Sequence, residues 1–105
     1  HLFLITDAVT ETELGEYPHL FKGDRYVMPD GTLSGSCLTM LKAVENCVNK
    51  VGIPLDEALR MASTYPAQLI KDQKRGLLKP GYRADIIVID SNLKHHSTYF
   101  SGILN

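Results

Sequence analysis

The chain opens with an unbroken apolar run. Leu2-Phe3-Leu4-Ile5 is followed directly by the polar pair Thr6 and Asp7. A run without alternation suits a strand that is covered on both faces, as in a parallel sheet flanked by helices. We therefore expect a strand over residues 2–7, with Asp7 at the end of the strand where active sites of such sheets gather.

Apolar residues three and four apart mark the middle of the chain. This spacing predicts an amphipathic helix whose apolar stripe is Leu38, Leu41, Val44, Cys47, Val48 and Val51. Thr39 is the expected N-cap of this helix, and Gly52 is the expected residue that ends it. Pro54 is expected to open a second helix, because the first turn does not need its missing N–H. Pro66 is expected to interrupt that helix, with a short helix restarting at Ala67.

Turn residues and short apolar stretches fill the rest of the chain. Residues 17–21 and 24–28 are separated by turn residues and predict a hairpin-like excursion. Residues 31–36, Gly-Thr-Leu-Ser-Gly-Ser, form either a tight turn or a loop that cradles a ligand. Residues 84–90 are rich in β-branched side chains and predict a second strand, and residues 98–100 a last one.

Composition narrows the function classes. Eleven basic and twelve acidic residues leave a net charge of −1, which gives no electrostatic footprint for nucleic acid. No apolar run approaches the roughly 20 residues that span a bilayer. Two cysteines make no disulfide framework, so we expect a reduced, cytoplasmic setting. The chain begins inside an expected strand without an initiator Met, which indicates a piece of a longer protein.

Few side chains offer catalytic chemistry. Asp7 is either an acid or base at a strand end or a cap of the following turn. No two of the four histidines are two or four residues apart, so we expect no metal site made from this chain alone. Cys47 lies on the helix stripe and is interpreted as a buried apolar residue.

Several segments together resemble a known enzyme family. They are Leu4-Ile5-Thr6-Asp7-Ala8, residues 30–36 (Asp-Gly-Thr-Leu-Ser-Gly-Ser), Leu38-Thr39-Met40, residues 58–67 and the Gly76-x-Leu78-x-Pro80-Gly81-x-x-Ala84-Asp85 tail. In this order they resemble the N-acetylglucosamine-6-phosphate deacetylases of the amidohydrolase superfamily. Lys71 departs from the glycine that the family often has there, which affects a helix end and no functional residue.

The resemblance implies an α/β fold that is the carboxy-terminal part of a larger one. Residues 1–75 would supply the last strand and helices of a (β/α)8 barrel, and residues 76–105 would supply strands of a small β-sandwich. The complete enzyme would be a homodimer. Its divalent metal, zinc or a similar ion, would be held by one Glu and two His upstream of His1.

The same resemblance implies a site and a reaction. Asp7 would take a proton from a metal-bound water and then protonate the amine that leaves N-acetylglucosamine 6-phosphate. Leu33, Ser34 and Gly35 would contact the substrate. Glucosamine 6-phosphate and acetate would be the products, with neither nucleic acid nor membrane as a partner, and this chain alone would be inactive.

Two alternatives remain beside this interpretation. One is another amidohydrolase that acts on an amide or a cyclic amide, against which residues 31–36 argue. The other is a non-catalytic domain that packs against or binds a partner, which the short length and the lack of metal ligands favour. A first strand that is apolar on both faces argues against an autonomous domain, because it needs neighbours on both sides.

Overall fold

The first sheet lies where the sequence predicts a hairpin. All 105 residues are described by a computed structural model. Three antiparallel strands follow one another in the sheet: β1 Leu20–Phe21, β2 Arg25–Val27 and β3 Leu33–Ser36. Gly23, at φ 79°, turns the chain between β1 and β2. The hairpin is therefore confirmed, whereas the Gly-Thr-Leu-Ser-Gly-Ser run is mostly a strand, a form that neither interpretation of it foresaw.

Helices occupy the middle of the chain, and their ends agree with the sequence signals. Their bounds are α1 Met40–Asn46, the π-helical turn η1 Cys47–Val51, α2 Leu55–Leu59, the π-helical turn η2 Arg60–Thr64 and α3 Tyr65–Leu69. The Thr39 hydroxyl accepts the Lys42 backbone N–H at 3.2 Å, as an N-cap does. Gly52 ends η1 in the left-handed conformation, at φ 80°.

The second helix passes through Pro66 without a break, so the expected interruption is wrong. In η2 the backbone N–H of Tyr65 donates to Arg60 O, five residues back. Pro66 is next in this pattern and has no N–H to donate, so the carbonyl of Met61 lacks this partner within the helix. Met61 O accepts the backbone N–H of Leu4 at 3.0 Å instead. This bond joins the first segment of the chain to the helix.

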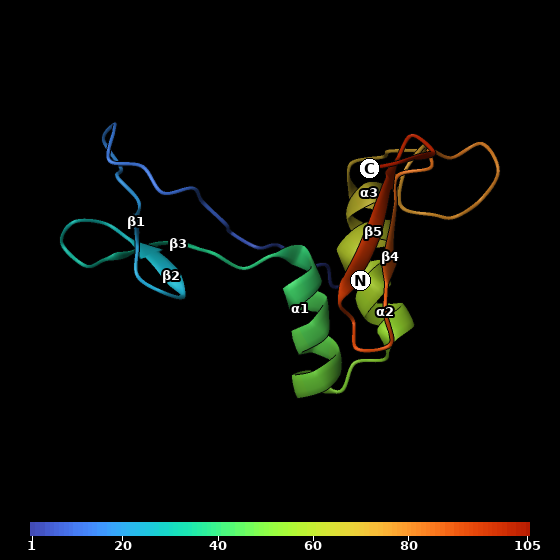
Figure 1. Ribbon diagram of the computed structural model, residues 1–105, viewed down its shortest axis with the longest axis horizontal. Coiled ribbons are helices and arrows are strands. Elements are labelled where there is room, and N and C mark those ends of the chain that lie inside the picture. Colours follow the sequence, from blue (N-terminus) through green and yellow to red (C-terminus); the bar gives the residue numbers. More distant parts are fainter.

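A second antiparallel sheet closes the chain. Its strands are β4 Ile86–Ile89, β5 His95–Phe100 and β6 Ile103–Leu104, in that order. Ser101 and Gly102, at φ 51° and 79°, form the tight turn between β5 and β6. The strands predicted within residues 84–90 and at 98–100 are thus confirmed. Figure 1 shows this sheet beside the helices, with the first sheet standing apart.

The expected strand over residues 2–7 does not form in the structure. This segment is extended, and Ala8 alone forms a β-bridge, parallel with Ser36. Leu2 and Ile5 are 76% and 72% exposed rather than covered on both faces. The prediction fails because a ladder needs a neighbouring strand, and no strand of this chain pairs along residues 2–7.

The molecule is elongated, because the first sheet lies away from the helices (Figure 1). Its extents are 49 × 30 × 28 Å, and its radius of gyration is 16.2 Å. A compact domain of about 100 residues has a radius of gyration of about 13 Å. The buried apolar side chains are correspondingly few: Val27, Ala43, Val44, Ala58, Met61 and Leu93. Each helix is too short or too polar to cross a lipid bilayer.

Candidate functional site

The segment around Asp7 lies against the end of β3. The backbone N–H of Ser36 donates to Asp7 O at 2.9 Å, and the backbone N–H of Val9 donates to Ser36 O at 3.2 Å. These two bonds form the parallel bridge between Ala8 and Ser36. They bring Asp7, the expected catalytic residue, together with Ser36, which follows the expected substrate residues 33–35 and is distant from Asp7 in the sequence.

Asp7 is exposed and lies at the centre of the three-residue turn Thr6 to Ala8, which a side-chain hydrogen bond closes. Its φ of 52° lies in the left-handed region, which aspartate and asparagine tolerate better than most residues. The hydroxyl of Thr6 accepts the Ala8 backbone N–H at 3.2 Å. Thr6 therefore provides the side-chain acceptor of this turn, a role that the sequence had left open for Asp7.

Gly35 makes the close approach of the two segments possible. It is buried, and a β-carbon at this position would lie 2.6 Å from both γ-carbons of Val9 and 3.2 Å from Asp7 O. Carbon atoms in contact are normally about 3.5–4.0 Å apart. Only a residue without a side chain lets the backbone of β3 reach the Asp7 turn.

Ser34 and Leu33 precede this contact on β3. Leu33 pairs with Val27 and Gly35 pairs with Tyr26, so Ser34 is an extra, unpaired residue in the ladder. Such β-bulges re-aim side chains and are common beside active sites. The Ser34 hydroxyl is buried without a hydrogen-bond partner, whereas Leu33 is 66% exposed. A buried hydroxyl without a partner needs an explanation, and a ligand could supply one.

The turn that leads into β3 is held by a carboxylate. Asp30 accepts the backbone N–H of Thr32 at 2.9 Å. This hydrogen bond stabilises the charged form and holds the pKa of Asp30 below its ordinary value. Asp30 is therefore a structural group of the turn, one residue outside the run of small residues.

The side chains of this chain do not assemble a metal centre. No three His, Cys, Asp or Glu side chains converge in a way that could hold an ion. The ring of His1 stacks on that of Tyr65 at 4.2 Å, and His95 Nε2 lies 2.7 Å from Thr98 Oγ1 on β5. The residues present do not fit the metal that the resemblance implies.

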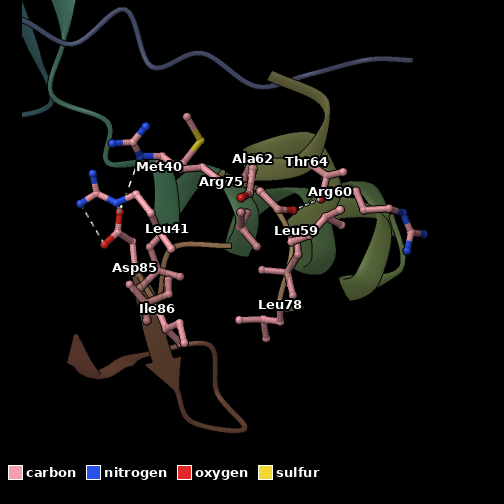
Figure 2. A pocket seen from close by; sticks show the side chains of 16 residues that line it. Met40, Leu41, Leu59, Arg60, Ala62, Thr64, Arg75, Leu78, Asp85 and Ile86 are labelled. Carbon is pink, nitrogen blue, oxygen red and sulfur yellow. Dashed lines mark hydrogen bonds and ion pairs between the residues drawn. The ribbon is translucent and has the colours of Figure 1, made fainter. Parts of the chain in front are cut away.

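A separate cavity of about 490 Å³ lies between the helices and β4 (Figure 2). Apolar side chains line most of it, including Met40, Leu41, Leu59, Leu78 and Ile86. At one edge Arg83 and Arg75 approach Asp85, at 3.0 and 3.6 Å. Asp7 and residues 33–35 are not part of its wall, so this cavity is distinct from the site at the Asp7 turn.

Ser36 is the residue that the sequence did not single out. It bonds the backbone on both sides of Asp7, yet its type and position resemble those of Ser34, two residues before it. No sequence signal separates the two serines, because the bridge between Ala8 and Ser36 joins residues that are 28 positions apart in the sequence.

Comparison with known proteins places this chain in a family. The model of the amidohydrolase family matches residues 2–104, and the chain belongs to that family. Its curated relatives include the N-acetylglucosamine-6-phosphate deacetylase of Bos taurus, 39% identical over 98% of this chain and 27% of the relative. The resemblance stated from the sequence motifs is thereby confirmed.

Two further matches bear on the substrate and the fold. The N-acetylgalactosamine-6-phosphate deacetylase of Escherichia coli O157:H7 is 33% identical over 98% of this chain and 29% of the relative. The crystal structure of the N-acetylglucosamine-6-phosphate deacetylase from Pasteurella multocida is similar with a TM-score of 0.88, at 30% identity. This match covers 99% of this chain and 30% of that one. The chain therefore spans between a quarter and a third of the length of these relatives.

Proposed function

We propose that the complete protein to which this chain belongs hydrolyses N-acetylglucosamine 6-phosphate to glucosamine 6-phosphate and acetate. The observation that carries the proposal is the contact between the Asp7 turn and β3 in a chain of the amidohydrolase family. It brings the backbone of Asp7 beside the residues expected to bind the sugar. The deacetylase relatives support the reaction type and the substrate class.

In this reaction Asp7 moves one proton. Water adds to the acetyl carbonyl carbon of the amide, and Asp7 takes the proton that this water releases. Asp7 then gives the proton to the amide nitrogen while the carbon–nitrogen bond breaks, so that acetic acid and a free amine form. The acid becomes acetate when it passes its remaining proton to the amine or to water. A carboxylate that acts first as base and then as acid must reach both the water and the nitrogen. Asp7 is exposed, so its carboxylate is accessible to water, as such a role requires.

The substrate would lie along β3. The Ser34 hydroxyl, buried without a partner in this chain, would find its hydrogen-bond partner in the sugar. The exposed Leu33 side chain and the backbone at Gly35 would border the same molecule. Ordering the sugar against this strand would hold the acetyl group beside Asp7.

The larger assembly belongs to the same proposal. Residues 1–75 would end a (β/α)8 barrel, and residues 76–105 would contribute to a β-sandwich. Members of the amidohydrolase family are generally metal-dependent. A divalent metal would be held by residues outside this chain, whose own side chains form no such centre. The complete enzyme would be a cytoplasmic dimer.

The test is the substitution Asp7→Asn in the complete protein. Asparagine keeps the size of the side chain and tolerates the left-handed turn, but it cannot carry the proton. We expect kcat to fall by about 10²–10⁴-fold with KM little changed. Asp24→Asn is the matched control, because Asp24 is an exposed aspartate of the hairpin that pairs with its neighbour Arg25 at 2.8 Å. Turnover by Asp7→Asn at the rate of the control would refute the role of Asp7.

A substrate panel separates the remaining alternatives. The Escherichia coli relative favours N-acetylgalactosamine 6-phosphate as a second candidate substrate. The two sugars differ only in the configuration at one hydroxyl-bearing carbon, so kcat/KM should be measured for both and for a cyclic amide such as hydantoin. A preference for the galacto sugar would replace the substrate and keep the reaction. A protein that hydrolyses none of the three when loaded with divalent metal would favour a non-catalytic role.

A further inference from the structure

Ser36 ties together the backbone on both sides of Asp7. Its N–H donates to Asp7 O at 2.9 Å, and its carbonyl accepts the Val9 N–H at 3.2 Å. Its hydroxyl donates a hydrogen bond to Thr6 O. Three of the four residues from Thr6 to Val9 are thus bonded to one serine.

The hydroxyl of Ser36 also reaches the start of a helix. Its Oγ accepts the backbone N–H of Leu38 at 3.2 Å. Leu38 immediately precedes Thr39, the N-cap of α1. The side chain of Ser36 therefore links the peptide before Asp7 to the beginning of the best-capped helix of the chain.

These bonds fix the two backbone angles of Asp7. The Thr6 carbonyl belongs to the peptide whose rotation sets φ of Asp7, and the Asp7 carbonyl belongs to the peptide that sets ψ. The Ser36 side chain holds the first peptide, and its main chain holds the second. Asp7 has φ 52°, a conformation that an L-residue leaves unless its surroundings hold it there.

We infer that Ser36 is a positioning residue for Asp7 and that its hydroxyl keeps the carboxylate in the orientation needed for proton transfer. The inference rests on the proposed function, because it assigns Ser36 a role through Asp7. Ser36 touches no reacting atom in this scheme. A displacement of a catalytic group by about 1 Å costs on the order of 10²-fold in rate, so one lost restraint on φ matters.

The first experiment compares Ser36→Ala with Ser36→Thr in the complete protein. Alanine removes both hydrogen bonds of the hydroxyl and leaves the two main-chain bonds. We expect kcat to fall by about 10–100-fold while KM changes by less than about threefold. Threonine keeps the hydroxyl and should restore most of the activity. The control is Ser91→Ala, which changes an exposed serine in the turn before β5.

The second experiment places Ser36→Ala in the Asp7→Asn background. If Ser36 acts through Asp7, it should have no further effect on the residual rate once the carboxylate is gone. An equal fall in both backgrounds would show a general structural role and overturn the inference. Full activity of Ser36→Ala alone would overturn it as well.

Failure of the proposed function is recognised separately. It would appear as unchanged turnover of Asp7→Asn, whatever Ser36 does. If Ser36→Ala does not fold, Ser36→Cys takes its place in both experiments, because a thiol fills a similar volume and is only a weak donor. Wild-type activity of Ser36→Cys would then count against the inference.

Discussion

A β-carbon on Gly35 would lie 2.6 Å from Cγ1 and Cγ2 of Val9. The φ angle of Gly35 is not positive, so this position requires glycine for the close approach of the two segments and not for an unusual backbone angle. The contact lies directly beside the bridge between Ala8 and Ser36. The width of one methyl group thus decides whether the two segments of the candidate site can meet.

The substitution Gly35→Ala should destabilise the complete protein by about 1–3 kcal/mol, because the added methyl group overlaps the Val9 side chain. Urea unfolding measures the change. Val9→Ala removes both γ-carbons, so the double variant should recover most of the loss that Gly35→Ala causes. A double variant whose two effects simply add would show that Val9 is not the obstacle.

Two features require glycine at position 76: a positive φ angle and a close approach of neighbouring atoms. Its φ is +90°, and a β-carbon there would lie 2.8 Å from the Ala67 β-carbon and 3.2 Å from Thr64 Cα. Gly15 has the same φ with no atom within 4 Å, which makes Gly15→Ala the matched control. We expect Gly15→Ala to cost about 1–2 kcal/mol for the backbone alone. Gly76→Ala should cost about 1–3 kcal/mol more in urea unfolding, and equal costs would contradict the predicted overlap.

Asp85 should contribute to the acid sensitivity of the protein. Its carboxylate accepts the Ser101 backbone N–H at 2.9 Å and lies beside Arg83, and these contacts hold its pKa below the ordinary value. A lowered pKa in the folded state gives stability that is present above the unfolded pKa of about 3.9. This contribution to the free energy of unfolding is lost as the pH falls through the lowered pKa of Asp85 in the folded state.

The test is the slope of unfolding free energy against pH. Between about pH 5 and pH 2 the slope should be shallower in Asp85→Asn, which keeps an acceptor for Ser101 but cannot ionise. Glu16→Gln, a substitution at an exposed loop residue, should leave the slope unchanged. An unchanged slope in Asp85→Asn would refute the assignment.

The 105-residue chain on its own should associate with itself and lack a sharp unfolding transition. Only 7 of its 105 residues are buried, and Leu2, Ile5 and Leu33 are among its exposed apolar side chains. Exposed apolar surface on this scale is commonly covered by other protein. Sedimentation velocity and denaturant titration test this expectation. A monomer with one cooperative transition would contradict it.

Local signals predicted the helices well. The cap at Thr39 and the ending at Gly52 depend on neighbouring residues, and both were read correctly from the sequence. The passage through Pro66 was not, because Met61 O, which the missing N–H of Pro66 would have bonded, accepts the backbone N–H of the distant Leu4 instead. That adjustment depends on a hydrogen-bond pattern that residue type does not reveal.

The candidate site was only partly predictable. Motif resemblance singled out Asp7 and residues 33–35, and the structure brings the Asp7 turn and Gly35 into contact. The partnership of Ser36 with Thr6 and Asp7 could not be predicted, because it follows from a bridge between distant segments. The strand expected over residues 2–7 was wrong for a related reason. Its apolar character predicts a strand that is covered on both faces, but no other strand of this chain pairs with it and Leu2 and Ile5 are exposed.

Residues 8–36, which contain the first sheet, leave and rejoin the rest of the chain at one point. Ala8 and Ser36 pair at its base, and Thr12 pairs with His19 just above. Everything between these residues is a closed excursion, so its outer turns can lengthen or shorten without moving Asp7. Doubling the length of a flexible loop costs only about 0.6 kcal/mol. The outer turns of this excursion, away from Leu33 to Gly35, are thus where evolution, or a protein engineer who inserts a tag or a reporter, can remodel this chain at a small cost to the reaction.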